Sequence, residues 1–271
     1  MNSLPSLTTD LALLCTAALA SAATIAAPLN AADDDVSDPP HIVFLVSNEQ
    51  DDNSYESART IPPFAEALAD AHGYRTTVLE AEFPESESSF PNIETIWDAD
   101  LLVVFCRRLG LPADQLTIIK NHVKAGKPVV ALKTANHGFA VRGPLVPGHF
   151  GWWEFVADIL GAENRGYTPR PFGTDVTVIE PDHPIVEGLP ANWRSENNLY
   201  LNTLLDPEAT VLLRGKAHGH DQPLAWIRRA GRSKVFYTAL GHPADFDDDR
   251  PHFRKLLTNA IRWGLETGEK P

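Results

Sequence analysis

The sequence predicts an α/β protein built on a doubly wound sheet that is mostly parallel, with an antiparallel extension at one side. In the first part of the chain, short apolar runs alternate with helical patterns over about 90 residues (41–132), which is typical of βαβ units. In the second part, closely spaced strand patterns lack helices between them, which indicates antiparallel pairing. The hydrophobic content of 43% is enough to bury a real core.

The expected elements of the first part follow from apolar runs and glycine stops. Residues 41–46 read HIVFLV, a continuous apolar run of the kind found in strands buried on both faces. A helical pattern over 58–71 stops at Gly73, a residue favoured at helix ends. We expect three more strands and a second helix that stops near Gly126: strands 74–79, 100–106 and 128–132, and helix 116–124.

The second part is less regular. A helix is expected over 152–160, ending at Gly161, and an amphipathic helix over 252–265 closes the chain. The strands expected between them are 175–179, 210–213, 224–227 and 235–239. Without an internal repeat or a second apolar core, we expect one domain over residues 41–268.

The N-terminal segment resembles an export signal. Residues 11–20 form a compact apolar run with the length of a signal-peptide core, too short for a typical membrane span, and small residues follow it. No Lys or Arg precedes this run, so a buried helix or an uncut anchor are the alternatives. We expect a signal peptide over 1–31, an acidic linker over 32–40, and a periplasmic or secreted mature protein.

Composition excludes several partners. The chain has 23 Lys and Arg against 36 Asp and Glu, for a formal net charge of −13. Such a surface repels nucleic acids and anionic membranes, so a small molecule is the expected partner and a homo-oligomer is left open. Two cysteines cannot build a disulfide framework or a zinc ribbon, and the absence of a Gly-rich phosphate loop argues against a nucleotide cofactor. We expect no cofactor.

Four polar segments follow predicted strands. They are residues 47–55, 106–108, 133–137 and 241–245. Ligands of open α/β sheets bind outside the carboxyl ends of the strands, so we expect these segments to surround one site.

Several of these residues carry a resemblance to known proteins. KPVVALKTANH (127–137) occupies the place of the nucleophile elbow in class I glutamine amidotransferases, and VFYTALGH (235–242) resembles the late strand and histidine of the trehalose-utilisation (ThuA-like) family. DHPIVEGL (182–189), NLY (198–200) and NAIRW (259–263) agree with that family in order and spacing. The resemblance covers about residues 41–265 and implies a flavodoxin-like, class I glutamine amidotransferase-like fold and a role in carbohydrate metabolism.

Two departures from the amidotransferase pattern argue against glutamine hydrolysis. That reaction needs a cysteine thiolate at the elbow, where this chain has Lys133. Ala244 stands where the orienting glutamate should follow His242 and Pro243. ThuA-like proteins usually have a histidine at the elbow, so Lys133 is a departure within that family as well.

The candidate catalytic residues are Lys133, His137 and His242. A partly desolvated Lys133 could act as a base or an electrostatic clamp, and the two imidazoles could transfer protons. The alternatives are equally weighted: Lys133 could hold its loop through a neighbouring acid, and either histidine could hydrogen-bond the backbone. The candidate substrate-binding residues are Asn48, Tyr55, Arg107, Asn136, Glu196, Tyr200 and Asp245.

Other reactive residues are weighed differently. Cys106 is expected to be a small buried side chain rather than a nucleophile. His218 and His220 with Asp221 form a weak metal pattern in a segment that resembles a hairpin connection, so no metal site is expected. Of Trp152 and Trp153, at least one is expected in the core and the other is a candidate sugar-stacking residue. The sequence thus favours a secreted ThuA-like protein that acts on a sugar by acid–base chemistry, and the alternative is a non-catalytic carbohydrate-binding domain.

Overall fold

The computed structural model describes residues 38–47, 55–82 and 84–266. The expected signal peptide and residues 32–37 of the expected linker lie outside the described residues. The described residues form a nine-stranded sheet with the order β2-β1-β3-β5-β13-β12-β11-β8-β9 and two small two-stranded sheets, β10-β7 and β4-β6.

The elements of the described residues have the following bounds. The strands of the large sheet are β1 (His41–Val46), β2 (Arg75–Glu80), β3 (Leu101–Phe105), β5 (Val129–Leu132), β8 (Thr174–Val178), β9 (Asn192–Ser195), β11 (Thr210–Ala217), β12 (His220–Ala230) and β13 (Ser233–Thr238). The other strands are β4 (Leu111–Pro112), β6 (His149–Phe150), β7 (Ala162–Tyr167) and β10 (Tyr200–Leu204). The helices are α1 (Ser57–His72), α2 (Ala113–Lys124) and α3 (Pro251–Leu265), and the short helical turns are η1 (Ile93–Asp98), η2 (Lys133–His137), η3 (Phe155–Leu160), η4 (Pro184–Val186) and η5 (Pro243–Phe246).

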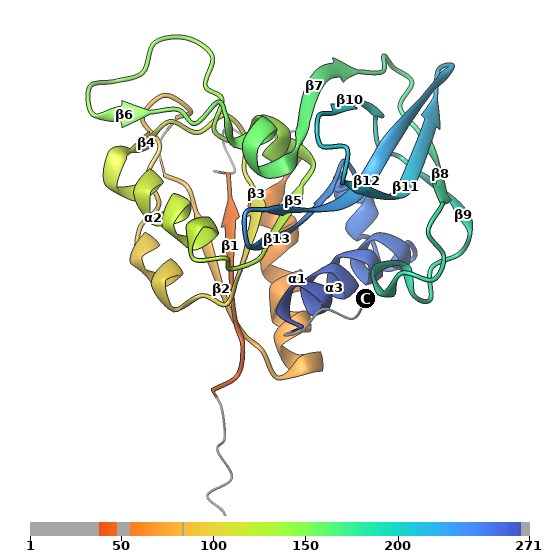
Figure 1. Ribbon diagram of the computed structural model, residues 1–271, viewed down its shortest axis with the longest axis horizontal. Helices are drawn as coiled ribbons and strands as arrows, with labels where there is room; N and C mark the ends of the chain where they lie inside the picture. Colours follow the sequence, from red (N-terminus) through yellow and green to blue (C-terminus); the bar gives the residue numbers. More distant parts are fainter. Residues whose placement is uncertain (1–37, 48–54, 83, 267–271) are drawn as a thin grey trace, which may run out of the picture. The chain divides into compact units, whose positions relative to one another are not determined.

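The large sheet confirms the predicted fold class. Strands β2, β1, β3, β5 and β13 are parallel, and β12, β11, β8 and β9 extend the sheet in antiparallel pairing. Figure 1 shows α1 and α3 together on one face of the parallel strands and α2 on the other. Because both faces are covered, the central strands are apolar throughout, as the sequence predicts.

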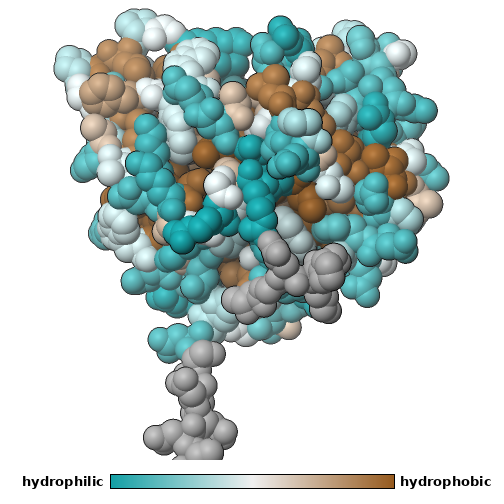
Figure 2. Space-filling model, in the orientation of Figure 1, coloured by the Kyte–Doolittle hydropathy of each residue, from teal (hydrophilic) through white to brown (hydrophobic). Residues whose placement is uncertain are grey.

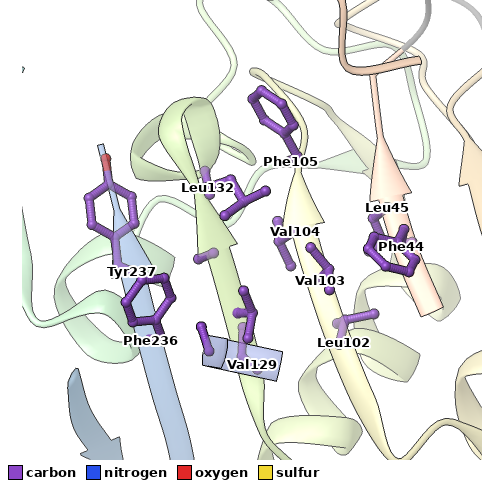
Figure 3. Close-up of a cluster of buried hydrophobic side chains, with 14 of the residues drawn as sticks. Phe44, Leu45, Leu102, Val103, Val104, Phe105, Val129, Leu132, Phe236 and Tyr237 are labelled. Atoms are coloured by element: carbon purple, nitrogen blue, oxygen red, sulfur yellow. The ribbon is translucent and has the colours of Figure 1, made fainter. Parts of the chain in front are cut away.

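The core lies on the central strands. Every residue of β1, β3 and β5 is buried, and Phe44, Val103 and Phe236 belong to the cluster of buried side chains on these strands and on β13 (Figure 3). The predicted end of α1 is also confirmed, because Gly73 adopts a left-handed φ of 68° and its N–H bonds to Ala69 O at 2.8 Å.

Three parts of the second half differ from the prediction. The helix expected over 152–160 is shorter and begins at Phe155, since Trp152 belongs to a preceding turn and packs against Phe139 and Phe155. Strands β11 and β12 are longer than predicted and meet at a tight turn in which His218 and Gly219 both have positive φ. Strands β7 and β9 were not predicted because their sequences, AENRGY and NWRS, are largely polar. The five-residue β10 (YLNTL) and the two-residue β4 and β6 were not predicted either.

The surface matches the composition. On the face seen in Figure 2, hydrophilic side chains surround separate groups of apolar ones. None of the helices in the described part of the chain combines the length and the apolar character that crossing a membrane requires.

Candidate functional site

The turn after β5 has the geometry of an elbow. Lys133 directly follows the strand, has a left-handed φ of 43°, and begins the helical turn η2. A positive φ is costly for a residue with a side chain, and such strain is typical of strand-to-helix elbows at functional sites. The backbone is tied down there, since Tyr237 Oη on β13 donates to Lys133 O at 2.9 Å.

The Lys133 side chain is completely buried and fully hydrogen-bonded. Its Nζ donates to Asn197 Oδ1, to Asn198 Oδ1 at 2.6 Å and to Asn198 O at 3.2 Å. The Tyr200 ring lies over the same nitrogen, 4.0 Å from the ring centroid. Lys133 therefore joins the elbow to the segment before β10.

Two effects act on the charge of Lys133. Burial lowers the pKa of its amino group well below the ordinary value, and the more distant Asp245 carboxylate opposes that shift. The three oxygen acceptors and the face of an aromatic ring favour the ammonium form, because a neutral amine has only two N–H bonds to donate. We assign Lys133 as an ammonium ion beneath Tyr200.

A cavity of about 700 Å³ lies above this layer, and we call it the central cavity. This volume is within the range of about 300–1,000 Å³ that is typical of small-molecule sites. The residues that line it come from the carboxyl ends of β3 and β5, from the start of α1, and from η3, β7 and β10: Tyr55, Arg107, Arg108, Asn136, His137, Ala140, Arg142, Trp153, Val156, Ala157, Ala162, Glu163, Asn164, Gly166, Tyr167, Tyr200 and Leu205. Figure 1 shows β7 and β10 above the central strands, where they complete this site.

His137 is a neutral imidazole in this cavity. Burial, followed by the charges of Arg108 and Arg107, lowers its pKa to about 3. Its Nδ1 lies within hydrogen-bonding distance of Asn136 Oδ1, an acceptor, and 3.4 Å from Asn164 Nδ2, a donor. We assign the proton to Nδ1 because the contact with Asn136 is the shorter one, and Nε2 then keeps its lone pair. At neutral pH His137 can therefore accept a hydrogen bond through Nε2.

Aromatic side chains form the rim. Trp153 is 59% exposed and Tyr167 is 61% exposed, whereas Trp152 is buried, so the expected division between the two tryptophans is confirmed. Tyr167 and Tyr200 lie with ring centroids 6.3 Å apart, and Tyr200 Oη donates to Tyr55 Oη at 3.0 Å. The cavity thus combines a tyrosine floor with exposed aromatic faces.

The structure brings together five of the ten predicted site residues: Tyr55, Arg107, Asn136, His137 and Tyr200 line the central cavity. Lys133 lies directly beneath it. Asn48 is outside the described residues. Glu196 and Asp245 line a different cavity of about 280 Å³, beside β9 and the start of α3.

Hydrogen bonds fix the positions of Asp245 and His242 outside the central cavity. Asp245 is buried and accepts from Ser195 Oγ at 2.7 Å and from the N–H groups of Gly241 and His242 at 3.1 Å each. His242 Nδ1 accepts from Ala244 N at 3.2 Å, which leaves its Nε2 unused by this cap. Burial lowers the pKa of His242, and His242 lines neither of these two cavities.

Glu196 forms a surface ion pair. Its carboxylate lies 3.4 Å from Arg250 Nη1, and 51% of the Glu196 side chain is exposed. Cys106, as expected, is fully buried.

Among the polar and aromatic side chains of the central cavity, sequence reasoning missed Arg142, Glu163, Asn164 and Tyr167. Three of them lie on β7, whose polar sequence AENRGY gave no strand signal, and Arg142 lies in a long connection. It also missed Asn197, which holds Lys133, because nothing local links residues 64 positions apart. The neighbouring NLY motif at 198–200 was the available signal.

The His218 segment is a hairpin turn. His218 Nε2 donates to Pro171 O at 2.8 Å, and Asp221 pairs with Arg214 at 2.6 Å. Within the described ranges, no group of three His, Cys, Asp or Glu side chains is arranged to hold a metal ion.

The fold and the elbow define an α/β protein with a mostly parallel sheet and a buried lysine, not a cysteine, at the turn after β5. A family model described as trehalose utilisation (ThuA) matches residues 43–264, and the chain belongs to this family. Among curated protein sequences none matches this chain.

Solved structures agree with this fold. A protein described as ThuA-like from Bacteroides uniformis is 16% identical, with a TM-score of 0.64 over 88% of this chain and 95% of its own. Another from Parabacteroides merdae is 16% identical, with a TM-score of 0.60 over 84% and 90%. A β-galactosidase from Rahnella sp. R3 is 14% identical, with a TM-score of 0.53 over 84% of this chain and 32% of its own.

Proposed function

We propose that this protein acts on a carbohydrate, or a derivative of one, in the central cavity. Its membership in the trehalose-utilisation family supports a role related to carbohydrates. The observation that favours it most is the pairing of exposed aromatic faces, Trp153 and Tyr167, with the polar groups of Asn136, His137 and Asn164. Aromatic faces stack on the apolar faces of sugar rings, while amides and imidazole hydrogen-bond to hydroxyl groups.

In this proposal His137 is the proton acceptor. It lines the cavity, and its Nε2 lone pair can accept a hydrogen bond from a ligand hydroxyl. Because the pKa of His137 is about 3 without a ligand, it takes the hydroxyl proton only where a bound ligand raises that pKa. Lys133 contributes a positive charge beneath Tyr200, which stabilises negative charge that develops on the ligand. His242 is a less direct candidate, because it lines neither cavity. Action in the periplasm or outside the cell, after removal of the signal peptide, is part of the same proposal.

The second candidate is a carbohydrate-binding domain without catalysis. It is favoured by one observation: the elbow position, where related folds place a reactive side chain, has a lysine whose amino group is fully buried and bound to asparagine oxygens. In that case His137 serves as a hydrogen-bond acceptor only.

Calorimetry and NMR test the two candidates together. Trehalose and a panel of neutral disaccharides are titrated into the protein, and each mixture is followed by NMR for product. We expect Trp153→Ala to weaken binding at least fivefold, because a stacked ring is lost. Trp97→Ala is the matched control, since Trp97 is 53% exposed and does not line the central cavity.

The outcomes separate the candidates. Product formation that His137→Gln lowers at least 100-fold while binding persists supports catalysis, and this factor corresponds to about 2.7 kcal/mol. Binding without product for every sugar supports the binding domain. If no sugar of the panel or of its charged derivatives binds, both candidates are wrong.

A further inference from the structure

The central cavity is positively charged in a strongly acidic protein. The chain has a net charge of −13, yet three arginines line this cavity: Arg107, Arg108 and Arg142. They are close enough that Arg142 and Arg107 both act to lower the pKa of Arg108, after the larger effect of burial. The three guanidinium groups therefore repel one another inside one cavity.

Arg108 is held rigidly at the cavity. Its backbone has a left-handed φ of 55°, and its N–H donates to His137 O at 3.0 Å. Its side chain is 8% exposed, Nη1 donates to Ala140 O at 3.1 Å, and Nε is buried with no partner. A buried N–H of a charged group without an acceptor is costly, and such a group is ready to bind one.

The carboxylates near the cavity already form ion pairs with arginines. Glu85 pairs with Arg107, and Glu163, the acidic residue among those that line the cavity, pairs with Arg165 at 2.8 Å. In the described part of the chain, neither Arg108 nor Arg142 pairs with a carboxylate. Arg108 and Arg142 therefore lack a paired carboxylate, and the Glu85 carboxylate that favours the charged form of Arg108 already pairs with Arg107.

We propose that the carbohydrate recognised by the central cavity bears an oxyanion group, a carboxylate or a phosphate, that binds Arg108 and Arg142. This inference rests on the proposed function of the same cavity. The planar guanidinium fork binds carboxylate and phosphate oxygens through paired, charge-assisted hydrogen bonds. The aromatic rim of Trp153 and Tyr167 then stacks on the sugar ring.

An anion bound to Arg108 and Arg142 also changes the pKa of His137. The charges of Arg108, Arg107 and Arg142 help to keep its imidazole unprotonated, so a bound anion that offsets them raises the pKa of His137 from about 3. An acidic sugar would thus make Nε2 a stronger proton acceptor than a neutral sugar does.

Matched pairs of ligands test the charge requirement. We would titrate glucose against glucuronate and glucose 6-phosphate, and galactose against galacturonate, each at low and at high salt, because these charged members keep the sugar ring. We expect the charged member to bind at least tenfold tighter at low salt, with a smaller ratio at high salt because ions screen the arginines. The uronates and the sugar phosphate show which oxyanion is preferred.

Three variants locate the effect. Arg142→Gln, at an exposed position, should reduce the preference for the charged member at least threefold, and Arg108→Gln should abolish it. Arg232→Gln is the control, because Arg232 is exposed in the turn between β12 and β13, away from the cavity. Thermal unfolding checks that each variant is folded, and Arg142→Gln alone decides if Arg108→Gln does not fold.

The outcomes distinguish this inference from the proposed function. If neutral and charged sugars bind equally, or if Arg142→Gln leaves their ratio unchanged, the oxyanion proposal is wrong while carbohydrate binding stands. If acetate and inorganic phosphate bind as tightly as the acidic sugars, the site binds anions and the carbohydrate function is wrong. If none of the ligands binds, both are wrong.

Discussion

At the scale of single residues, the main finding is that the buried Lys133 side chain connects two segments of the site through hydrogen bonds. Its ammonium group connects the elbow after β5 to Asn197 and Asn198, and the ring of Tyr200 lies between it and the central cavity. Lys133 therefore acts on a ligand in two ways: through its positive charge, and by fixing the position of the Tyr200 ring. Direct contact with the ligand would require Tyr200 to move.

Replacing Lys133 tests this role. We expect Lys133→Met to lower the free energy of unfolding by about 2–4 kcal/mol, because it leaves buried asparagine oxygens without a donor. Urea denaturation measures the change. Lys216→Met is the control, since Lys216 is exposed and pairs with Asp221 at 3.3 Å, and surface pairs of this kind contribute little. Unchanged stability combined with lost turnover would instead indicate that Lys133 acts on the ligand directly.

At the scale of elements, the contact between α2 and the start of β5 contains a pH-sensitive residue. His122 on α2 is buried, and its Nε2 donates to Pro128 O at 3.1 Å. Burial lowers the pKa of His122 to about 4. The helix therefore packs on the sheet with a neutral imidazole that the unfolded chain would protonate at an ordinary pKa of about 6.5.

The direction in which pH changes the stability of the protein through His122 follows from proton linkage. Above pH 6.5 His122 is neutral in both states and has no effect, whereas between pH 6.5 and 4 only the unfolded state gains the proton, so stability falls as the pH falls. Lowering the pKa of His122 from about 6.5 to about 4 corresponds to about 3 kcal/mol.

A variant isolates this contribution. Between pH 7 and pH 4, we expect the free energy of unfolding of the wild type to fall by about 2–3 kcal/mol more than that of His122→Gln. Urea denaturation at each pH measures both changes. His220→Gln, at an exposed position on β12, should behave like the wild type. Identical pH profiles for the wild type and His122→Gln would contradict the assignment.

At the scale of the whole molecule, the expectation of export concerns residues outside the described part of the chain. We expect the full-length protein, expressed in a Gram-negative host, to reach the periplasm with a new N-terminus between about residues 21 and 33. Leu14→Arg should keep it in the cytoplasm, because a charge interrupts the apolar run. Cell fractionation and mass spectrometry measure both, and an intact Met1 on cytoplasmic wild-type protein would refute the expectation.

How much could be predicted from the sequence differs between fold and site. After His41, HIVFLV is apolar at every position because β1 is covered on both faces, so the residues of the strand themselves indicate that it is buried. Arg107, Asn136 and His137 follow parallel strands, and their meeting at one edge follows from topology. Strand β7 could not be predicted, since its exposed, polar residues carry no periodic signal.

The sequence alone was sufficient for the fold class and for the family resemblance. Three of the four predicted polar segments contribute residues to the central cavity, whereas segment 241–245 does not. The three-dimensional packing was needed to show which of those polar groups are free to meet a ligand. Lys133 donates hydrogen bonds to asparagines 64 and 65 positions away, and Asp245 accepts a hydrogen bond from Ser195, 50 positions away. Hydrophobic patterns reflect local burial, whereas hydrogen-bond partners between distant segments depend on how the whole chain packs, and no local pattern encodes that.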